Sequence, residues 1–223
     1  MGGGGPRHQP AWPPPATVRR WHLRAHGGLA EDAPPVSEPD QYRYDPAEPT
    51  PAVGGTSTGP SSGPKDNREL EARPDVLTYS TGPLAAEVEI TGPVRAELYV
   101  TSTLAHTDFF ARLCDVDPKG RSVNVTDGIR RLSPDTVPAP DVEAGADGVL
   151  AVQVELAPTA YRVAAGHRIR LQVSAGAFPR YARNFGTGEP FGTATRAVRC
   201  RTDVYHDAAR PACLVLPVRP GAG

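Results

Sequence analysis

Apolar and polar residues alternate over several short stretches in the second half of the chain, a period of two that is typical of strands with one buried face. The clearest pair covers residues 86–90 and 94–100, which the turn Thr91-Gly92-Pro93 joins into a predicted hairpin. Further strands are expected at residues 109–116, 122–125, 149–156, 169–173 and 213–218. Two aromatic segments nearer the start, 18–23 and 40–45, are each expected to add a strand to the same body.

Helical patterns are scarce by comparison. Residues 66–72 can form about two turns, and elsewhere a glycine or proline interrupts every longer candidate. The 23 glycines and 26 prolines strengthen that conclusion, because both residue types break helices. About seven short strands without helices between them predict an all-β fold, a jelly-roll-like β-sandwich of the galactose-binding-domain type.

The turn-forming residues also divide the chain. We expect a disordered Gly/Pro leader at residues 1–11 and a Pro/Gly-rich, extended lead-in at 12–75 that packs on the sandwich through its aromatics. An exposed loop is expected at 50–65 within this lead-in, followed by the β-sandwich body at 76–218 and a disordered tail at 219–223.

Charge and cysteine usage narrow the partners and the compartment. Lys and Arg total 24 against 25 acidic residues, a net charge of −1, so we expect neither nucleic acid nor a membrane as a partner. The three cysteines have no C-x-x-C spacing, and no export signal or long apolar segment is visible, which together predict a cytoplasmic protein. Homo-oligomer formation stays open.

The most tempting catalytic motif is G-x-S-x-G, which occurs twice in overlap, around Ser57 and around Ser61. A serine nucleophile of this type sits on a strained turn between a buried strand and a helix. Here the preceding residues are Pro49-Thr50-Pro51 and the following ones Gly63-Pro64, so both supports are missing. We interpret the segment as a loop rather than a nucleophile site.

Histidines and carboxylates give no better reaction centre. His206 and Asp207 are adjacent on a predicted strand, and adjacent side chains point to opposite faces, so they make a poor proton relay. His167 begins a strand and is expected to bond a turn carbonyl. The arginines at 180, 183 and 196 lie among aromatics, either as a binding surface or, as we favour, as pins of a long loop. We expect no catalytic residue, metal or cofactor.

Several segments in order resemble the C-terminal domain of the CocE/NonD family of serine hydrolases, which is related to Xaa-Pro dipeptidyl-peptidases. The similarity runs from about residue 12 to residue 218. The segments include Trp12-Pro13-Pro14, Tyr44-Asp45-Pro46, Gly54-Gly55, Thr78-Tyr79-Ser80-Thr81, Gly166-His167-Arg168, Phe178-Pro179-Arg180 and Leu216-Pro217.

The resemblance implies a jelly roll that packs on an α/β-hydrolase domain, and that domain carries the Ser-His-Asp triad. Because the catalytic domain is absent, the chain alone is expected to be inactive, although family activity is hydrolysis of esters, amides or N-terminal Xaa-Pro dipeptides. The partner would be a catalytic domain encoded upstream or on a separate chain, which makes this chain a truncated or split member. The family's loop after Gly-Gly reaches the substrate pocket.

In this sequence that interdomain or pocket-facing loop corresponds to Thr56, Ser57, Thr58, Ser61 and Ser62. The alternative to a hydrolase domain is a free-standing carbohydrate- or ligand-binding jelly-roll module, because the same scaffold serves both. An autonomous hydrolase would need helices that the pattern does not predict.

Overall fold

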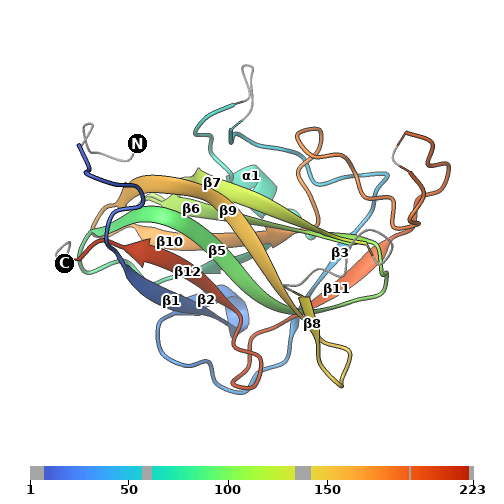
Figure 1. Ribbon diagram of the computed structural model, residues 1–223, viewed down its shortest axis with the longest axis horizontal. Coiled ribbons are helices and arrows are strands. Elements are labelled where there is room, and N and C mark those ends of the chain that lie inside the picture. Colours follow the sequence, from blue (N-terminus) through green and yellow to red (C-terminus); the bar gives the residue numbers. More distant parts are fainter. Residues whose placement is uncertain (1–7, 57–61, 134–141, 191, 221–223) are drawn as a thin grey trace.

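The structure, a computed structural model, describes residues 8–56, 62–133, 142–190 and 192–220. Within these ranges, twelve strands form one hydrogen-bonded sheet that folds into two layers (Figure 1). The strands are β1 (Thr17–Arg24), β2 (Gly28–Ala30), β3 (Asp40–Tyr44), β4 (Leu77–Ser80), β5 (Val88–Ser102), β6 (Thr107–Val116), β7 (Ser122–Leu132), β8 (Val142–Ala144), β9 (Leu150–Val163), β10 (Arg168–Ser174), β11 (Cys200–Tyr205) and β12 (Cys213–Val218). The helical elements in the described part of the chain are a 3-10 turn, η1 (Ala25–Gly27), and one short helix, α1 (Arg68–Glu71). The all-β sandwich that the alternation predicted is confirmed.

The longest strand, β5, organises the front layer, and it shows that the hairpin expected at residues 86–100 was wrong. Gly92, with φ of 133°, lets the chain pass a bulge against β9 instead of turning back, so residues 88–102 form one strand. One of its edges pairs with β9 along nearly its whole length, while the other pairs first with β12 and then with β11. β1 extends this layer beyond β12, and β3 extends it beyond β11. The two aromatic segments of the lead-in are therefore strands of the sheet, as their pattern predicted.

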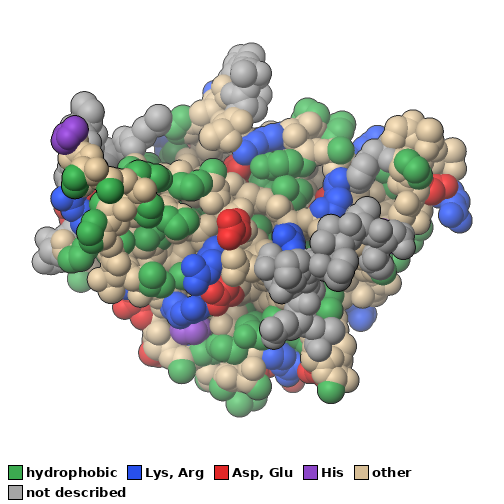
Figure 2. Space-filling model, in the orientation of Figure 1, with side chains coloured by type: hydrophobic (Ala, Val, Ile, Leu, Met, Phe, Trp, Pro, Cys, Tyr) green, Lys and Arg blue, Asp and Glu red, His purple; other side chains and the backbone are tan. Residues whose placement is uncertain are grey.

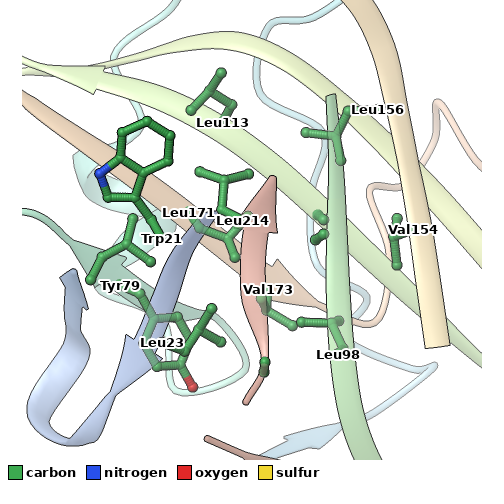
Figure 3. Packing of buried hydrophobic residues seen from close by; sticks show 14 of the residues in the cluster. Trp21, Leu23, Tyr79, Leu98, Leu113, Val154, Leu156, Leu171, Val173 and Leu214 are labelled. Carbon is green, nitrogen blue, oxygen red and sulfur yellow. The ribbon is translucent and has the colours of Figure 1, made fainter. Parts of the chain in front are cut away.

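The second layer contains β4, β10, β6 and β7, and a single parallel bridge between Gly28 and Ser80 connects it to β2. The hydrophobic core lies between the layers (Figure 3). Trp21, Leu98 and Leu214 enter it from the front, and Leu113, Leu171 and Tyr79 from the back. Burial of this apolar surface is the main stabilising term for the fold.

The middle strand of the second layer, β6, is buried on both faces. Its inner face meets the core. On its outer face, Arg112 contacts Asn67, the residue just before α1, and Phe110 contacts Tyr181 in the loop after β10. The polar residues on that outer face are consequently removed from water. They form the polar network described below.

The segment 50–65, expected to be an exposed loop, is tied down at its start. Thr50 is 1% exposed, and its Oγ1 donates a hydrogen bond to Asp75 Oδ2 at 2.7 Å. Its backbone carbonyl accepts from Phe178 N, and Pro51 forms a bridge with Phe178. The sequence could not indicate this anchoring because Phe178 is far along the chain.

Candidate functional site

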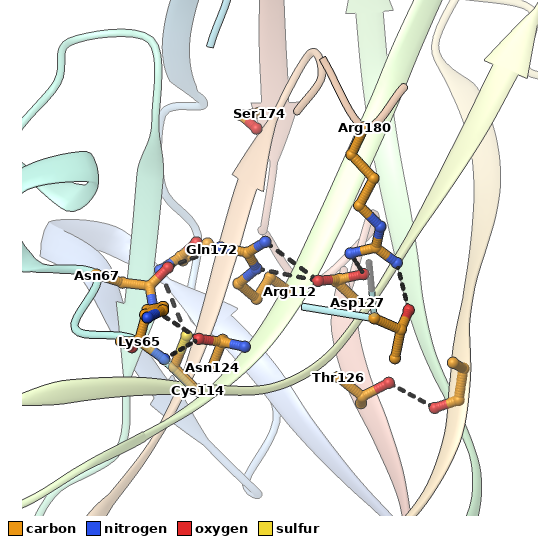
Figure 4. A network of polar contacts seen from close by, with 12 residues as sticks. Lys65, Asn67, Arg112, Cys114, Asn124, Thr126, Asp127, Gln172, Ser174 and Arg180 are labelled. Carbon is orange, nitrogen blue, oxygen red and sulfur yellow. Dashed lines mark hydrogen bonds and ion pairs between the residues drawn. The ribbon is translucent and has the colours of Figure 1, made fainter. Parts of the chain in front are cut away.

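A fully buried arginine on β6, Arg112, lies within a network of polar contacts (Figure 4). Arg112 Nη1 donates to Asn67 Oδ1 at 2.7 Å, and its Nε and Nη2 donate to Asp127 Oδ2 at 3.3 and 3.1 Å. Since β6 and β7 are antiparallel neighbours, Arg112 and Asp127 are direct cross-strand partners. A buried guanidinium needs such an anion, because an unpaired charge in the interior is strongly destabilising.

Asp127 also binds a second arginine, from the loop after β10. Arg180 Nη1 lies 2.5 Å from Asp127 Oδ1, and Arg180 Nη2 donates to Thr56 Oγ1 at 2.8 Å. The Arg180 guanidinium stacks on the Tyr181 ring at 5.0 Å. The carboxylate thus joins two cations, and the second of them holds one end of the Gly-Gly loop.

The other end of that loop is held by Asn124 on β7. Asn124 Nδ2 donates to Gly63 O at 3.1 Å, while its Oδ1 accepts from Lys65 N at 2.8 Å. Gly55 and Gly63 exchange two backbone hydrogen bonds of 3.0 and 2.9 Å, which closes the loop as a hairpin stem.

The Gly-Gly pair has a steric reason at this position. Gly54 and Gly55 have φ of 64° and 89°, a region that favours glycine. A Cβ on Gly54 would lie 2.6 Å from Asn124 Oδ1, and one on Gly55 would overlap the Arg180 guanidinium. The loop stem therefore requires both glycines.

Of the predicted loop residues, the structure describes two. Thr56 bonds Arg180, and Ser62 is half-buried next to Gly63. Ser57, Thr58 and Ser61 lie outside the described residues.

A groove of about 540 Å³ lies between this hairpin stem and the strands β7 and β9. Its walls are largely apolar, and they include Val125, Ala157, Pro158, Tyr161 and Pro64. In Figure 2, hydrophobic side chains gather on the part of the surface where β5 and β9 run in Figure 1. We call this space the β7–β9 groove.

Gly128 lets β7 and β9 meet below the groove. A Cβ at this position would overlap the Glu155 carbonyl oxygen. Next to it, Thr126 Oγ1 donates to Ala157 O at 2.6 Å. The two strands come from different layers, and they meet here by this local contact and not by strand pairing.

A second cluster contains serine, histidine and aspartate. His206 Nδ1 lies 2.8 Å from Ser37 Oγ, and His206 Nε2 lies 3.0 Å from Asp40 Oδ2. The imidazole is 1% exposed and packs edge-on against Tyr79, so no substrate leaving group can reach it. We interpret the cluster as a link between the lead-in and the end of β11.

Asp207 takes no part in that cluster, as its position next to His206 predicted. Its carboxylate accepts from the backbone N–H groups of Ala209 and Arg210, which stabilises a turn. The partners of His206 were missed because they lie 166 and 169 residues away in the sequence.

His167 also has a carboxylate partner instead of the expected turn carbonyl. Its Nδ1 lies 2.7 Å from Asp115 Oδ1, and the other carboxylate oxygen accepts from Tyr161 OH at 3.0 Å. Burial and the nearby Asp115 charge raise the pKa of Tyr161. The phenol stays protonated and acts as a hydrogen-bond donor.

The buried thiols are poor nucleophiles. Burial raises the pKa of Cys114 to about 12 and that of Cys213 to about 11. Because the thiolate is the reactive form, neither side chain is activated near neutral pH.

The aromatic loop after β10 is pinned by arginines, as expected. Arg183 stacks on Phe178 and Phe185, each at 5.1 Å, whereas Arg196 lies beside Glu189 at the surface. Throughout the described ranges, no group of three His, Cys, Asp or Glu side chains could hold a metal ion. None of the helices described there has the length and hydropathy to span a bilayer.

These features define a β-sandwich domain whose buried polar groups support a loop and an apolar groove at its surface. The chain belongs to the family of X-Pro dipeptidyl-peptidase C-terminal non-catalytic domains, which matches residues 1–215. This confirms the resemblance to the C-terminal domain of CocE/NonD hydrolases.

Similar proteins agree with that assignment. The chain is 37% identical over 198 residues to the cocaine esterase of Rhodococcus sp. (strain MB1 Bresler), covering 86% of this chain and 34% of the esterase. It is 33% identical over 190 residues to a putative serine esterase of Mycobacterium bovis, covering 73% and 29% of the two chains. The chain thus spans about a third of the length of these relatives.

Solved structures give the same result. An α-amino acid ester hydrolase aligns with a TM-score of 0.78 at 26% identity, covering 91% of this chain and 36% of that one. An aminopeptidase from a Thaumarchaeota archaeon has the same fold, with a TM-score of 0.77 at 24% identity over 93% and 37% of the two chains.

Proposed function

We propose that this chain is the non-catalytic β-sandwich domain of a serine hydrolase and acts by packing on an α/β-hydrolase catalytic domain. The observation that carries the proposal is the family match over residues 1–215 together with the 34% share of the Rhodococcus esterase that the chain covers. The catalytic domain belongs either to a longer form of the same polypeptide or to a separate chain. The complete enzyme hydrolyses esters, amides or N-terminal Xaa-Pro dipeptides by an acyl-enzyme route.

Within that enzyme, the loop with Thr56, Ser57, Thr58, Ser61 and Ser62 faces the catalytic domain near its substrate pocket. The contacts at both ends of the loop support this role, because Arg180 holds Thr56 and Asn124 holds Gly63. A loop that shapes a substrate pocket needs such a rigid base to act reproducibly.

We also propose a cytoplasmic location for the chain. All three cysteines, Cys114, Cys200 and Cys213, are free and buried, which suits a reducing compartment.

A free-standing carbohydrate-binding module has less support. Such modules stack sugars on exposed aromatic rings, and the exposed large aromatics among the described residues are Trp12 and Phe178. A glycan array probed with the purified chain tests this alternative directly, and specific binding to a sugar would favour it.

A chimera tests the proposed function. In it, residues 8–220 of this chain replace the matching third of the Rhodococcus esterase. We expect a folded protein that hydrolyses 4-nitrophenyl acetate, whereas the esterase without that third loses activity. A chimera that folds no better than the shortened esterase would contradict the proposal.

A further inference from the structure

The β7–β9 groove lies where β7 and β9 approach each other, through the contact of Gly128 with Glu155, without pairing as strands. β9 pairs with β5 on one edge, and on its other edge the described strand β8 pairs only with residues 150–152. Among the described strands β7 pairs with β6 alone, and a single bridge joins its start to Asp66. The adjoining edges of both strands therefore border the groove, and Ala157 and Pro158 there are exposed. Such edges are ordinarily covered by another element.

The polar side chains that β7 places in the groove already have partners within this chain. Asp127 binds Arg112 and Arg180, Thr126 donates to Ala157 O, and Asn124 bonds Gly63 and Lys65. A polar small molecule would thus find few groups to recognise it, since ligand sites orient their ligands through available donors and acceptors. The apolar wall instead suits an apolar protein segment.

The lead-in enters the sheet beside the groove. A Cβ added to Gly92 would lie 3.4 Å from Pro13 Cβ, so Pro13 packs directly against β5 at this position. The strand partner of Gly92 is Thr159, which lines the groove. In the family, the matched domain is C-terminal, so the catalytic part comes before it. A polypeptide arriving from that part reaches this domain one strand away from the groove.

We propose that the β7–β9 groove binds an apolar segment of the α/β-hydrolase catalytic domain. This inference rests on the proposed function and adds the surface through which the two domains associate. Such a segment accounts for three observations. The facing edges of β7 and β9 are not paired with each other, the polar side chains of β7 in the groove already have partners within this chain, and the lead-in joins the sheet next to the groove. Gly55, Thr56, Gly63 and Pro64 form one wall of the groove, so docking here also holds both ends of the loop against the catalytic domain.

The test compares two arginine variants of the chimera. Ala157→Arg places a charge in the groove, whereas the control Val36→Arg lies elsewhere on the surface at a residue that is 90% exposed. Thermal unfolding of the isolated chain establishes that each variant folds like the original. A charge left unpaired in a desolvated interface weakens association by about 100-fold.

We expect Ala157→Arg to separate the unfolding of the two domains in the chimera and to lower its esterase activity, with Val36→Arg unchanged. If the two variants are indistinguishable in an active chimera, the groove is not the docking surface, while the proposed function stands. If the unmodified chimera is itself inactive and unfolded, the proposed function fails. If Ala157→Arg unfolds the isolated chain, Pro158→Glu replaces it with the same expected outcomes.

Discussion

Replacing Asp127 by asparagine removes the one carboxylate that neutralises two arginines. Arg112 has 0% of its side chain exposed and Arg180 has 12%, so water cannot replace the lost charge. Asparagine keeps the shape of the side chain and one acceptor oxygen. The change therefore isolates the charge from the packing.

The expected loss of stability follows from the burial of Arg112. Breaking a buried ion pair by removing one partner costs about 3–5 kcal/mol, because a charge is left without compensation. Since the amide oxygen of the introduced asparagine retains one hydrogen bond, the lower end applies, and we expect Asp127→Asn to reduce the free energy of unfolding by about 3 kcal/mol.

Urea unfolding of the chain, with the slope m compared between variants, measures this loss. The matched control is Glu31→Gln, which breaks the Arg19–Glu31 pair, whose side chains are 39% and 43% exposed. An exposed pair contributes only about 0–1 kcal/mol, so this variant should be nearly neutral. A loss below about 1 kcal/mol for Asp127→Asn would refute the view that this carboxylate holds the network together.

Three further predictions follow from local geometry. Gly128→Ala should lower the free energy of unfolding by about 3 kcal/mol, because the added Cβ would meet Glu155 O. The control Gly82→Ala has open space around it and should not lower the free energy of unfolding. Equal urea midpoints for the two variants would contradict this prediction. His206→Ala should lower the free energy of unfolding by about 2–3 kcal/mol, and with it the melting temperature, because it removes the contacts to Ser37 and Asp40. An unchanged melting temperature would contradict the view that this cluster links the lead-in to the end of β11. Burial raises the pKa of Cys114 to about 12 and that of Cys213 to about 11, whereas thiols of the unfolded chain have a pKa of about 8.5. The two buried thiols therefore stabilise the fold fully below about pH 8.5, and this stabilisation decreases as the pH rises toward their pKa values in the folded protein. Urea midpoints should therefore decrease between pH 8 and pH 11 (roughly the range of these ionisations), and a flat profile would contradict the burial of the thiols.

Sequence patterns predicted which residues lie in strands where one face is buried and the other is exposed to solvent, but not how the strands connect, since the hairpin expected at 86–100 is one strand. In β5, alternate side chains from Val94 to Val100 are buried, which is the pattern that the sequence displays. The short helix at Arg68–Glu71 lies inside the predicted segment 66–72. Local sequence is enough in these cases, because the period of apolar and polar residues indicates both the type of element and its buried face.

Contacts between distant residues were beyond such reasoning. The burial of Arg112 depends on Asn67 and on the other segments that cover the outer face of β6. The hydrogen bond from Arg180 to Thr56 joins residues that are 124 positions apart in the sequence. The Ser37–His206–Asp40 cluster likewise joins the lead-in to β11. Periodicity carries no information on such pairings, since it reports which face is buried and not what covers it.

The G-x-S-x-G motifs around Ser57 and Ser61 also show how little a short local motif establishes by itself. The missing strand and helix argued against a nucleophile. The stem that the structure describes consists of Gly55, Gly63 and their backbone bonds, with Thr56 held by Arg180.

The central claim is that this domain supports a hydrolase without performing the chemistry. The most direct test incubates the purified chain with 4-nitrophenyl acetate and with a fluorophosphonate probe that labels activated serines. We predict no turnover above the buffer rate and no labelled serine, including Ser37 beside His206 and the loop serines Ser57 and Ser61. Turnover that disappears on Ser37→Ala or Ser57→Ala would contradict the claim and place a working nucleophile in this domain.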